Sequence, residues 1–125
     1  MQETAVWNET RDQLLLERVR HCRRYLCRLR GLTFRRSLGQ NEGLLLIGQR
    51  ESRLETAIHM LFVFFPITVV WLDADGWVLD VRLARPCRPI YVPRVPAQDV
   101  LEGGVDLIRH VSIGDRLYFG EQTGV

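Results

Sequence analysis

The spacing of hydrophobic and polar residues changes several times along the chain, and each spacing predicts a different element. Residues 77–84 alternate apolar and polar side chains, which is typical of a half-buried strand. Residues 5–7 and 14–20 predict the two strands of a hairpin, and the polar stretch 8–12 between them supplies its turn. We therefore expect the fold to begin with a β-hairpin.

The longest apolar run, residues 58–72, reads IHMLFVFFPITVVWL and predicts buried strands. A membrane-spanning helix needs about 20 apolar residues, whereas this run has 15 and contains Pro66, so no membrane span is expected. Its content of Val, Ile, Phe and Trp favours strands. We expect two strands divided at Phe65-Pro66, the second buried on both faces, and then a hairpin turn at Asp73–Gly76.

A helical spacing of apolar residues is clearest in the first third of the chain. The residues that recur at this spacing are Tyr25, Leu26, Leu29 and Leu32. Arginines fill the opposite side of the helix that this pattern describes. Gly31 lies where such a helix would end. The pattern predicts the main helix of the protein over residues 23–32.

Shorter elements complete the predicted fold. They are a strand at 44–47, a surface loop or helical turn at 48–55, an extended proline-rich segment at 85–96, a short helix at 105–110, a last strand at 115–119 and a frayed tail at 120–125. The predicted fold class is α+β. We expect a compact, mostly antiparallel β single domain over residues 1–125, with one main helix and short helical turns.

Composition fits an ordinary small globular domain and adds one asymmetry of charge. With 46% hydrophobic and 26% charged residues, 125 residues can bury a core without a structural metal. The net charge is +2, and all 17 basic residues are arginine, which GC-rich codon usage explains. Eight arginines lie within residues 18–36 without an acid among them. This cluster is the most strongly charged candidate surface.

The cysteines and the first residues predict a cytoplasmic protein. Cys22, Cys27 and Cys87 are an odd number and form no Cys-x-x-Cys pair, so we expect free thiols and no zinc site. Residues 1–13 lack the basic-then-apolar pattern of a signal peptide. Cys87 is a candidate reactive thiol because arginines flank it, and the alternative is an ordinary exposed cysteine.

Short motifs in a fixed order point to a known family. They are Arg30-Gly31-Leu32, Phe34-Arg35, Glu42-Gly43-Leu44, Met60, Phe65-Pro66-Ile67, Leu72-Asp73, Gly76, Pro86-Cys87, Val100-Leu101-Glu102 and Gly114-Asp115. Together they resemble the family catalogued as domain of unknown function 192 (DUF 192), over roughly Arg18 to Phe119. The resemblance implies a compact, mostly β single domain. It leaves the function open, because no biochemical activity is established for that family.

The chain departs from this family pattern at two places. Many members carry a polar Trp-Met-Lys-Asn-Thr run where this chain has the apolar run His59-Met60-Leu61-Phe62-Val63. Members also often show an aspartate where this chain has Thr68. The resemblance therefore implies that a site lined by these positions in relatives is altered here.

The family-like motifs and the apolar run supply the candidate binding residues. They are Arg30, Arg35, Glu42, His59, Met60, Thr68 and Asp73. His59 could act as a base or a ligand, and the alternative is a histidine that bonds to backbone at a strand end. Asp73 and Asp75 could bind a cation or do acid–base chemistry, and the alternative is that they only shape a turn.

The arginine cluster supplies a second candidate surface. Arg23, Arg24 and Arg28 are the candidate residues for binding an anion or a nucleic acid, since guanidinium groups match phosphate geometry. The alternative is a solvated helix face. No phosphate-binding glycine motif, metal motif or cofactor motif is present, so we predict no cofactor and no metal.

Three hypotheses for the function follow from these residues. The first is a non-catalytic binding module whose partner is a small molecule or a protein. The second is an enzyme, for example a hydrolase, whose site includes His59, Asp73 and Arg35. The third is nucleic-acid binding through the arginines of residues 18–36, which predicts a steep dependence of affinity on salt.

Overall fold

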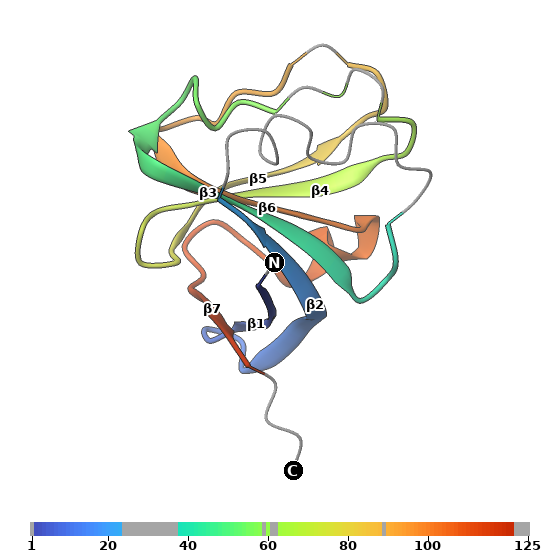
Figure 1. Ribbon diagram of the computed structural model, residues 1–125, viewed down its shortest axis with the longest axis vertical. Coiled ribbons are helices and arrows are strands. Elements are labelled where there is room, and N and C mark those ends of the chain that lie inside the picture. The colour runs from blue at the N-terminus through green and yellow to red at the C-terminus, as the bar shows by residue number, and fades with distance from the viewer. Residues whose placement is uncertain (1, 24–37, 59, 61–62, 89, 122–125) are drawn as a thin grey trace.

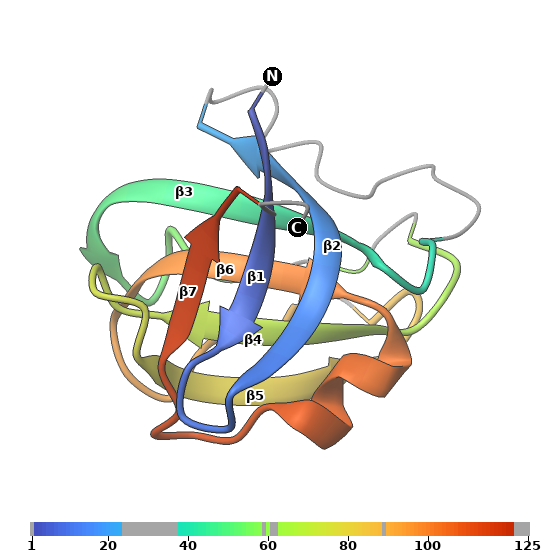
Figure 2. The same ribbon diagram turned by 90° about the horizontal axis from the view of Figure 1, so that it is seen from below.

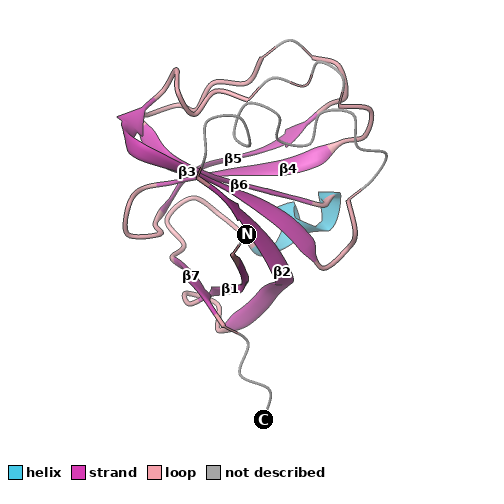
Figure 3. Cartoon of the chain, viewed as in Figure 1, coloured by secondary structure: helices cyan, strands magenta, loops and turns pink. Residues whose placement is uncertain are grey.

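The computed structural model describes residues 2–23, 38–58, 60, 63–88 and 90–121, and these form seven strands and one short 3₁₀ helix. The elements are β1 (Glu3–Asn8), β2 (Gln13–Cys22), β3 (Glu42–Ser52), β4 (Ile67–Leu72), β5 (Val78–Ala84), β6 (Ala97–Gly103), the helix η1 (Val105–His110) and β7 (Leu117–Gly120). Figure 3 shows how strands and connecting loops make up most of the described chain.

The seven strands form one sheet in the order β5-β4-β6-β3-β2-β1-β7 (Figure 1). Neighbouring strands are antiparallel except β2 and β3, which run parallel. The sheet curls strongly, and Figure 2 shows β1, β2 and β7 crossing over β4 and β5. The pairing of β1 with β7 joins residues from the two ends of the sequence, with Ala5 opposite Gly120. The result is a curled half-barrel.

Backbone hydrogen bonds bring the two edges of the curled sheet together at one end. The Val78 amide at the start of β5 donates to the Asp115 carbonyl over 2.8 Å, and the Leu117 amide donates to the Gly76 carbonyl over 2.8 Å. Trp77 and Arg116 form an isolated bridge at the same place. The curl is therefore fixed by contacts between the start of β5 and the start of β7.

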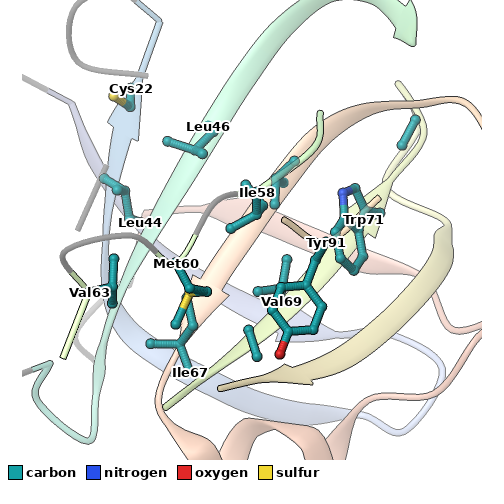
Figure 4. Packing of buried hydrophobic residues seen from close by; sticks show 13 residues of the cluster. Cys22, Leu44, Leu46, Ile58, Met60, Val63, Ile67, Val69, Trp71 and Tyr91 are labelled. Atoms are coloured by element: carbon teal, nitrogen blue, oxygen red, sulfur yellow. The ribbon is translucent and has the colours of Figure 1, made fainter. Parts of the chain in front are cut away.

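Two hydrophobic clusters fill the opposite faces of β3, β6 and β4, because successive residues of a strand point to opposite sides. The inner cluster lies inside the curl and consists of Val6, Leu16, Val19, Leu45, Val70, Leu72, Val78, Leu101, Leu107, Val111 and Leu117. The outer cluster consists of Cys22, Leu44, Leu46, Ile58, Met60, Val63, Ile67, Val69, Trp71, Ala84, Tyr91, Ala97 and Val100 (Figure 4). Since both faces of β4 are covered, every residue of β4 is buried, as predicted.

The predicted fold class, α+β with one main helix, is wrong. Among the described residues, 54% are in strands and 6% are helical, and no helix has seven or more residues. The predicted helix over 23–32 lies, except for Arg23, outside the described residues. The strand content is higher than predicted for two reasons. Strand β3 continues through the polar residues 48–52. Strand β6 was not predicted, because the polar residues Gln98, Asp99 and Glu102 interrupt its apolar pattern.

Other predictions are confirmed. The hairpin of β1 and β2, strand β5 and the last strand β7 are present, and the short helix covers residues 105–110 as expected.

Two predicted segments differ from the structure. The first half of the apolar run is not a strand in its described part, where Ile58 makes an isolated bridge with Tyr91. The proline-rich segment 85–96 was expected to be extended, but its described part contains a turn at Pro86-Cys87 and a bend at Arg94-Val95.

Candidate functional site

A pocket of about 380 Å³ opens beside η1, where the chain enters β3. Its lining residues are Leu15, Leu16, Leu38, Gln40, Asn41, Gly104, Val105, Asp106, Leu107 and His110. They come from β2, from the segment before β3 and from η1. The pocket therefore combines parts of the chain that are far apart in sequence and that only the curled sheet brings together.

The floor of the pocket depends on two glycines that face each other across β3 and β6. Gly43 is opposite Gly103 in the register. A Cβ atom on Gly43 would lie 2.7 Å from Leu16 Cδ1, and one on Gly103 would lie 2.7 Å from Leu107 Cδ2. Because neither glycine has a side chain, both leucines pack closely against the sheet and form an apolar floor.

Thr68 holds the backbone at the edge of this pocket. Its Oγ1 donates to the Gly104 carbonyl over 2.8 Å, and the Leu107 amide donates to the same carbonyl over 3.1 Å. Thr68 itself is fully buried in β4. The residue that replaces the family's aspartate therefore lies behind the pocket wall and bonds to the chain where η1 begins.

The described part of the pocket rim is polar and includes one carboxylate. Gln40, Asn41, Asp106 and His110 are exposed there. The side-chain amide nitrogen of Gln13 lies 3.2 Å from His110 Nδ1. This contact pairs the Gln13 amide with the imidazole ring of His110. The rim thus offers amide groups, one imidazole ring and the carboxylate of Asp106.

A buried carboxyl group lies in β6 on the face of the outer cluster. Glu102 is 4% exposed and is paired in register with Leu44 and Val69. Figure 4 shows Met60 between Leu44 and Val69, and all three side chains belong to the outer cluster. Glu102 Oε1 has no hydrogen-bond partner. Burial raises the pKa of Glu102 from 4.5 to about 7.

Glu102 is the residue with unusual chemistry that sequence reasoning did not select. A carboxyl group with a pKa near neutrality can hold or release a proton under physiological conditions, and such groups cluster at functional sites. The available signal was its position in the motif Val100-Leu101-Glu102, where an acid stands among strand-forming residues. That signal was lost because β6 was not predicted.

The predicted binding residues are dispersed over the structure. Met60 is fully buried in the outer cluster. Thr68 and Asp73 lie at opposite ends of β4. Asp73 Oδ1 accepts hydrogen bonds from the amides of Asp75 and Trp77, each 2.9 Å long, so this carboxylate shapes the β4–β5 turn. Glu42 lies 3.9 Å from the Arg18 guanidinium at the start of β3.

Several predicted residues lie outside the described residues. They are Arg24, Arg28, Arg30, Arg35 and His59. Arg23 is described and is exposed directly after β2.

The cysteines differ from expectation. Cys22 is disulfide-bonded, which contradicts the prediction of free thiols and removes that argument for a cytoplasmic location. Cys27 lies outside the described residues. Cys87 is free and exposed, and it adopts a left-handed backbone with φ of 62°. Its amide donates to the Met60 carbonyl over 2.9 Å, which ties the proline-rich segment to the outer cluster.

A family model identifies the relatives of this chain. The model DUF192, described as "Uncharacterized ACR, COG1430", matches residues 6–119. The chain belongs to the DUF192 family. Curated relatives carry the name UPF0127 protein, as in Thermococcus kodakarensis (34% identity over 106 residues, 85% of this chain and 66% of that protein) and Pyrococcus furiosus (31% identity over 112 residues, 88% and 93%). The chain thus spans just under two thirds of the Thermococcus protein.

Two solved structures share the fold of this DUF192 chain. A candidate transcription regulator from Sinorhizobium meliloti superposes with a TM-score of 0.81 at 22% identity, covering 94% of this chain and 92% of that one. A protein of unknown function from Novosphingobium aromaticivorans superposes with a TM-score of 0.76 at 20% identity, covering 93% and 83%. At these identities the likeness shows the fold alone.

Two features are absent from the described residues. None of the helices found there has the length and apolar character needed to cross a membrane. In the same part of the chain, no three His, Cys, Asp or Glu side chains lie together as a set of metal ligands.

Proposed function

We propose that this DUF192 domain is a non-catalytic binding module that holds a small molecule in the pocket beside η1. The pocket is the observation that carries the proposal. Its volume of about 380 Å³ falls in the range of roughly 300–1,000 Å³ that small-molecule sites occupy. Its floor of leucines and its polar rim offer a small molecule both apolar contacts and hydrogen-bonding groups.

The composition of the pocket favours binding over catalysis. The described lining residues include no serine, threonine or cysteine that could act as a nucleophile. Among these described residues, His110 is the one histidine, and its Nδ1 is paired with the Gln13 amide. Asp73, a suspect in the enzyme hypothesis, is engaged in its own turn. Glu102 is not part of the lining.

The test fills the pocket without disturbing the fold. Gly104 lines the pocket with φ of −67° and ψ of 169°, and a Cβ atom there meets nothing within 4 Å. Gly104→Phe should therefore fold normally and occupy the cavity. A ligand-observed NMR screen of small fragments against the wild-type protein should give binders that Gly104→Phe no longer binds.

The matched control adds an equal ring elsewhere. Val95 is exposed in the proline-rich segment and does not line the pocket, so Val95→Phe should keep the binding of every fragment. Fragments that bind wild type and Gly104→Phe equally, or a screen without any binder, would overturn the proposed function.

Nucleic-acid binding is the second candidate function. The Sinorhizobium neighbour is described as a candidate transcription regulator, and Arg18, Arg20 and Arg23 are exposed along and just after β2. Fluorescence anisotropy with a labelled duplex between 50 and about 200 mM salt separates the candidates, because phosphate binding weakens steeply with salt. An affinity that ignores salt would exclude this function.

A further inference from the structure

We propose that the pocket selects a small primary amine with an apolar body, whose ammonium group binds Asp106. This inference rests on the proposed function and names its ligand class. The ammonium group would lie at the rim, and the apolar body would lie on the floor formed by Leu16 and Leu107.

The charge of the residues that line the pocket determines the preferred charge of the ligand. The chain holds 17 arginines and has a net charge of +2, and the described residues that line this pocket include no arginine. Among these described lining residues, Asp106 is the one acid. An anionic ligand would meet the Asp106 carboxylate, which repels it, and a cationic ligand would meet an opposite charge. The charge of the described lining therefore favours a cationic ligand over an anionic one.

The hydrogen-bond acceptors of the pocket rim suit an ammonium group. An ammonium group has three donors and no acceptor. Beside the Asp106 carboxylate, the amide oxygens of Gln40 and Asn41 are acceptors in the same lining. Within the described chain, the side chains of these three residues make no hydrogen bond, so all three remain available to a ligand.

The apolar floor carries the third step. Leu16 and Leu107 are 2% and 4% exposed, so the deep side of the pocket is hydrophobic. A body without polar groups suits this floor, because a buried polar group without a partner costs binding free energy. The size of the cavity restricts that body to a short chain or one ring.

Asp106 also has a competing structural role. It lies in the first turn of η1, where an acid stabilises a helix through the exposed amides. That role predicts an effect on stability and none on ligand preference. The experiment therefore measures affinity for matched ligands and not stability alone.

The experiment uses hexylamine, hexan-1-ol and hexanoate as probes in isothermal titration calorimetry at one ionic strength. Wild-type protein should bind hexylamine about two- to fivefold tighter than hexan-1-ol, the effect of an exposed ion pair. Hexanoate should bind weakest. Asp106→Asn should reduce the affinity for hexylamine to that for hexan-1-ol, and Asp106→Glu should restore the preference.

The control removes an equal charge outside the pocket. Asp75 is exposed in the β4–β5 turn, and Asp75→Asn should leave all three affinities unchanged. An equal loss of hexylamine binding in Asp75→Asn would overturn the assignment to Asp106. Tighter binding of hexan-1-ol or hexanoate that Gly104→Phe abolishes would overturn the amine preference and leave the proposed function standing. Failure of every probe and fragment to bind would overturn both.

Discussion

At the scale of single residues, two buried ionisable groups stand out. Within the described chain, Glu102 Oε1 and His21 Nδ1 are the buried side-chain atoms without a hydrogen-bond partner. His21 Nε2 lies 2.7 Å from Thr4 Oγ1, and burial, with Arg23 as a second cause, lowers the pKa of His21. Both groups are therefore more stable uncharged in the folded protein.

The buried carboxyl group of Glu102 should make the free energy of unfolding depend on pH. Its pKa is raised in the folded state to about 7, so the folded protein binds more protons than the unfolded chain between pH 4.5 and about 7. The contribution of Glu102 to stability is thus present below pH 4.5 and is lost as the pH rises to about 7. At about 1.4 kcal/mol per pKa unit, the loss is about 3 kcal/mol.

The variant Glu102→Gln should remove this dependence. We expect it to be more stable than wild type at pH 8 by about 1–3 kcal/mol, measured by urea denaturation, with the advantage disappearing near pH 4.5. His21, whose lowered pKa costs stability as the pH falls below 6.5, is present in both proteins and cancels in the difference. A difference that does not change with pH would contradict the prediction.

The sequence predicted functional roles for Asp73 and Asp75 and none for Glu102, whose pKa is raised by burial. Asp73 lies in a turn that contains a glycine, and its carboxylate accepts hydrogen bonds from two backbone amides of that turn. Glu102 is chemically unusual only because β3, β4 and the segment around Met60 surround it. Such an environment arises from pairings that a linear pattern does not contain.

At the scale of elements, turns were easier to predict than strands. The β4–β5 turn was predicted because Asp75-Gly76 supplies the backbone that such a turn requires, and Gly76 has φ of 89°. β6 was missed because polar side chains interrupt its alternation, although pairing with β3 and β4 buries it. Turn chemistry is local, whereas strand formation in β6 depends on its neighbours in the sheet.

Two glycines with the same backbone conformation allow a matched test at this scale. Gly76 and Gly114 have φ of 89° and 96°. A Cβ atom on Gly76 would lie 2.4 Å from the Leu117 carbonyl oxygen, whereas one on Gly114 meets nothing within 4 Å. Gly114→Ala should cost about 1 kcal/mol through backbone strain alone.

Gly76→Ala should cost about 3 kcal/mol or more, because the clash adds to the same strain and breaks the contact between the edges of the sheet. Urea denaturation of both variants measures the difference. Equal losses of stability in the two variants would show that Gly76 serves the turn alone.

At the scale of the whole molecule, one hydrogen-bond network joins the first hairpin to the segment between η1 and β7. Asp115 Oδ2 accepts from Asn8 Nδ2 over 2.8 Å and from the Ser112 amide over 2.9 Å, and it lies 3.3 Å from Arg11 Nε. Asn8 Nδ2 also donates to the His110 carbonyl over 2.9 Å. These contacts hold η1 and β7 against the first hairpin.

Asp115→Ala should therefore destabilise the fold by about 3 kcal/mol, since it leaves several donors, one of them on buried Asn8, without their acceptor. Glu121→Ala, which removes an exposed acid just after β7, should change stability by less than about 0.5 kcal/mol. Midpoints of thermal unfolding compare the two variants. Similar midpoints for both would refute a structural role for the network.

The overall arrangement lay beyond sequence analysis for a geometric reason. The alternation of residues 78–84 predicts a strand, but it does not say that β5 and β7 meet at Val78 and Asp115. The pocket beside η1 was also missed, because its walls come from residues 15–16, 38–41 and 104–110. Each of these segments is ordinary alone, and the site exists only after the sheet has curled.

The pairing of β1 with β7 has a consequence for how the protein is made. Ribosomes release the chain in order, so the first hairpin emerges while its outer edge still lacks Leu117–Gly120, the strand that completes it. An unpaired edge invites association with other chains. That edge of β1 therefore stays unpaired until Leu117–Gly120 has emerged, which makes the interval before then the stage at which chaperones would matter most.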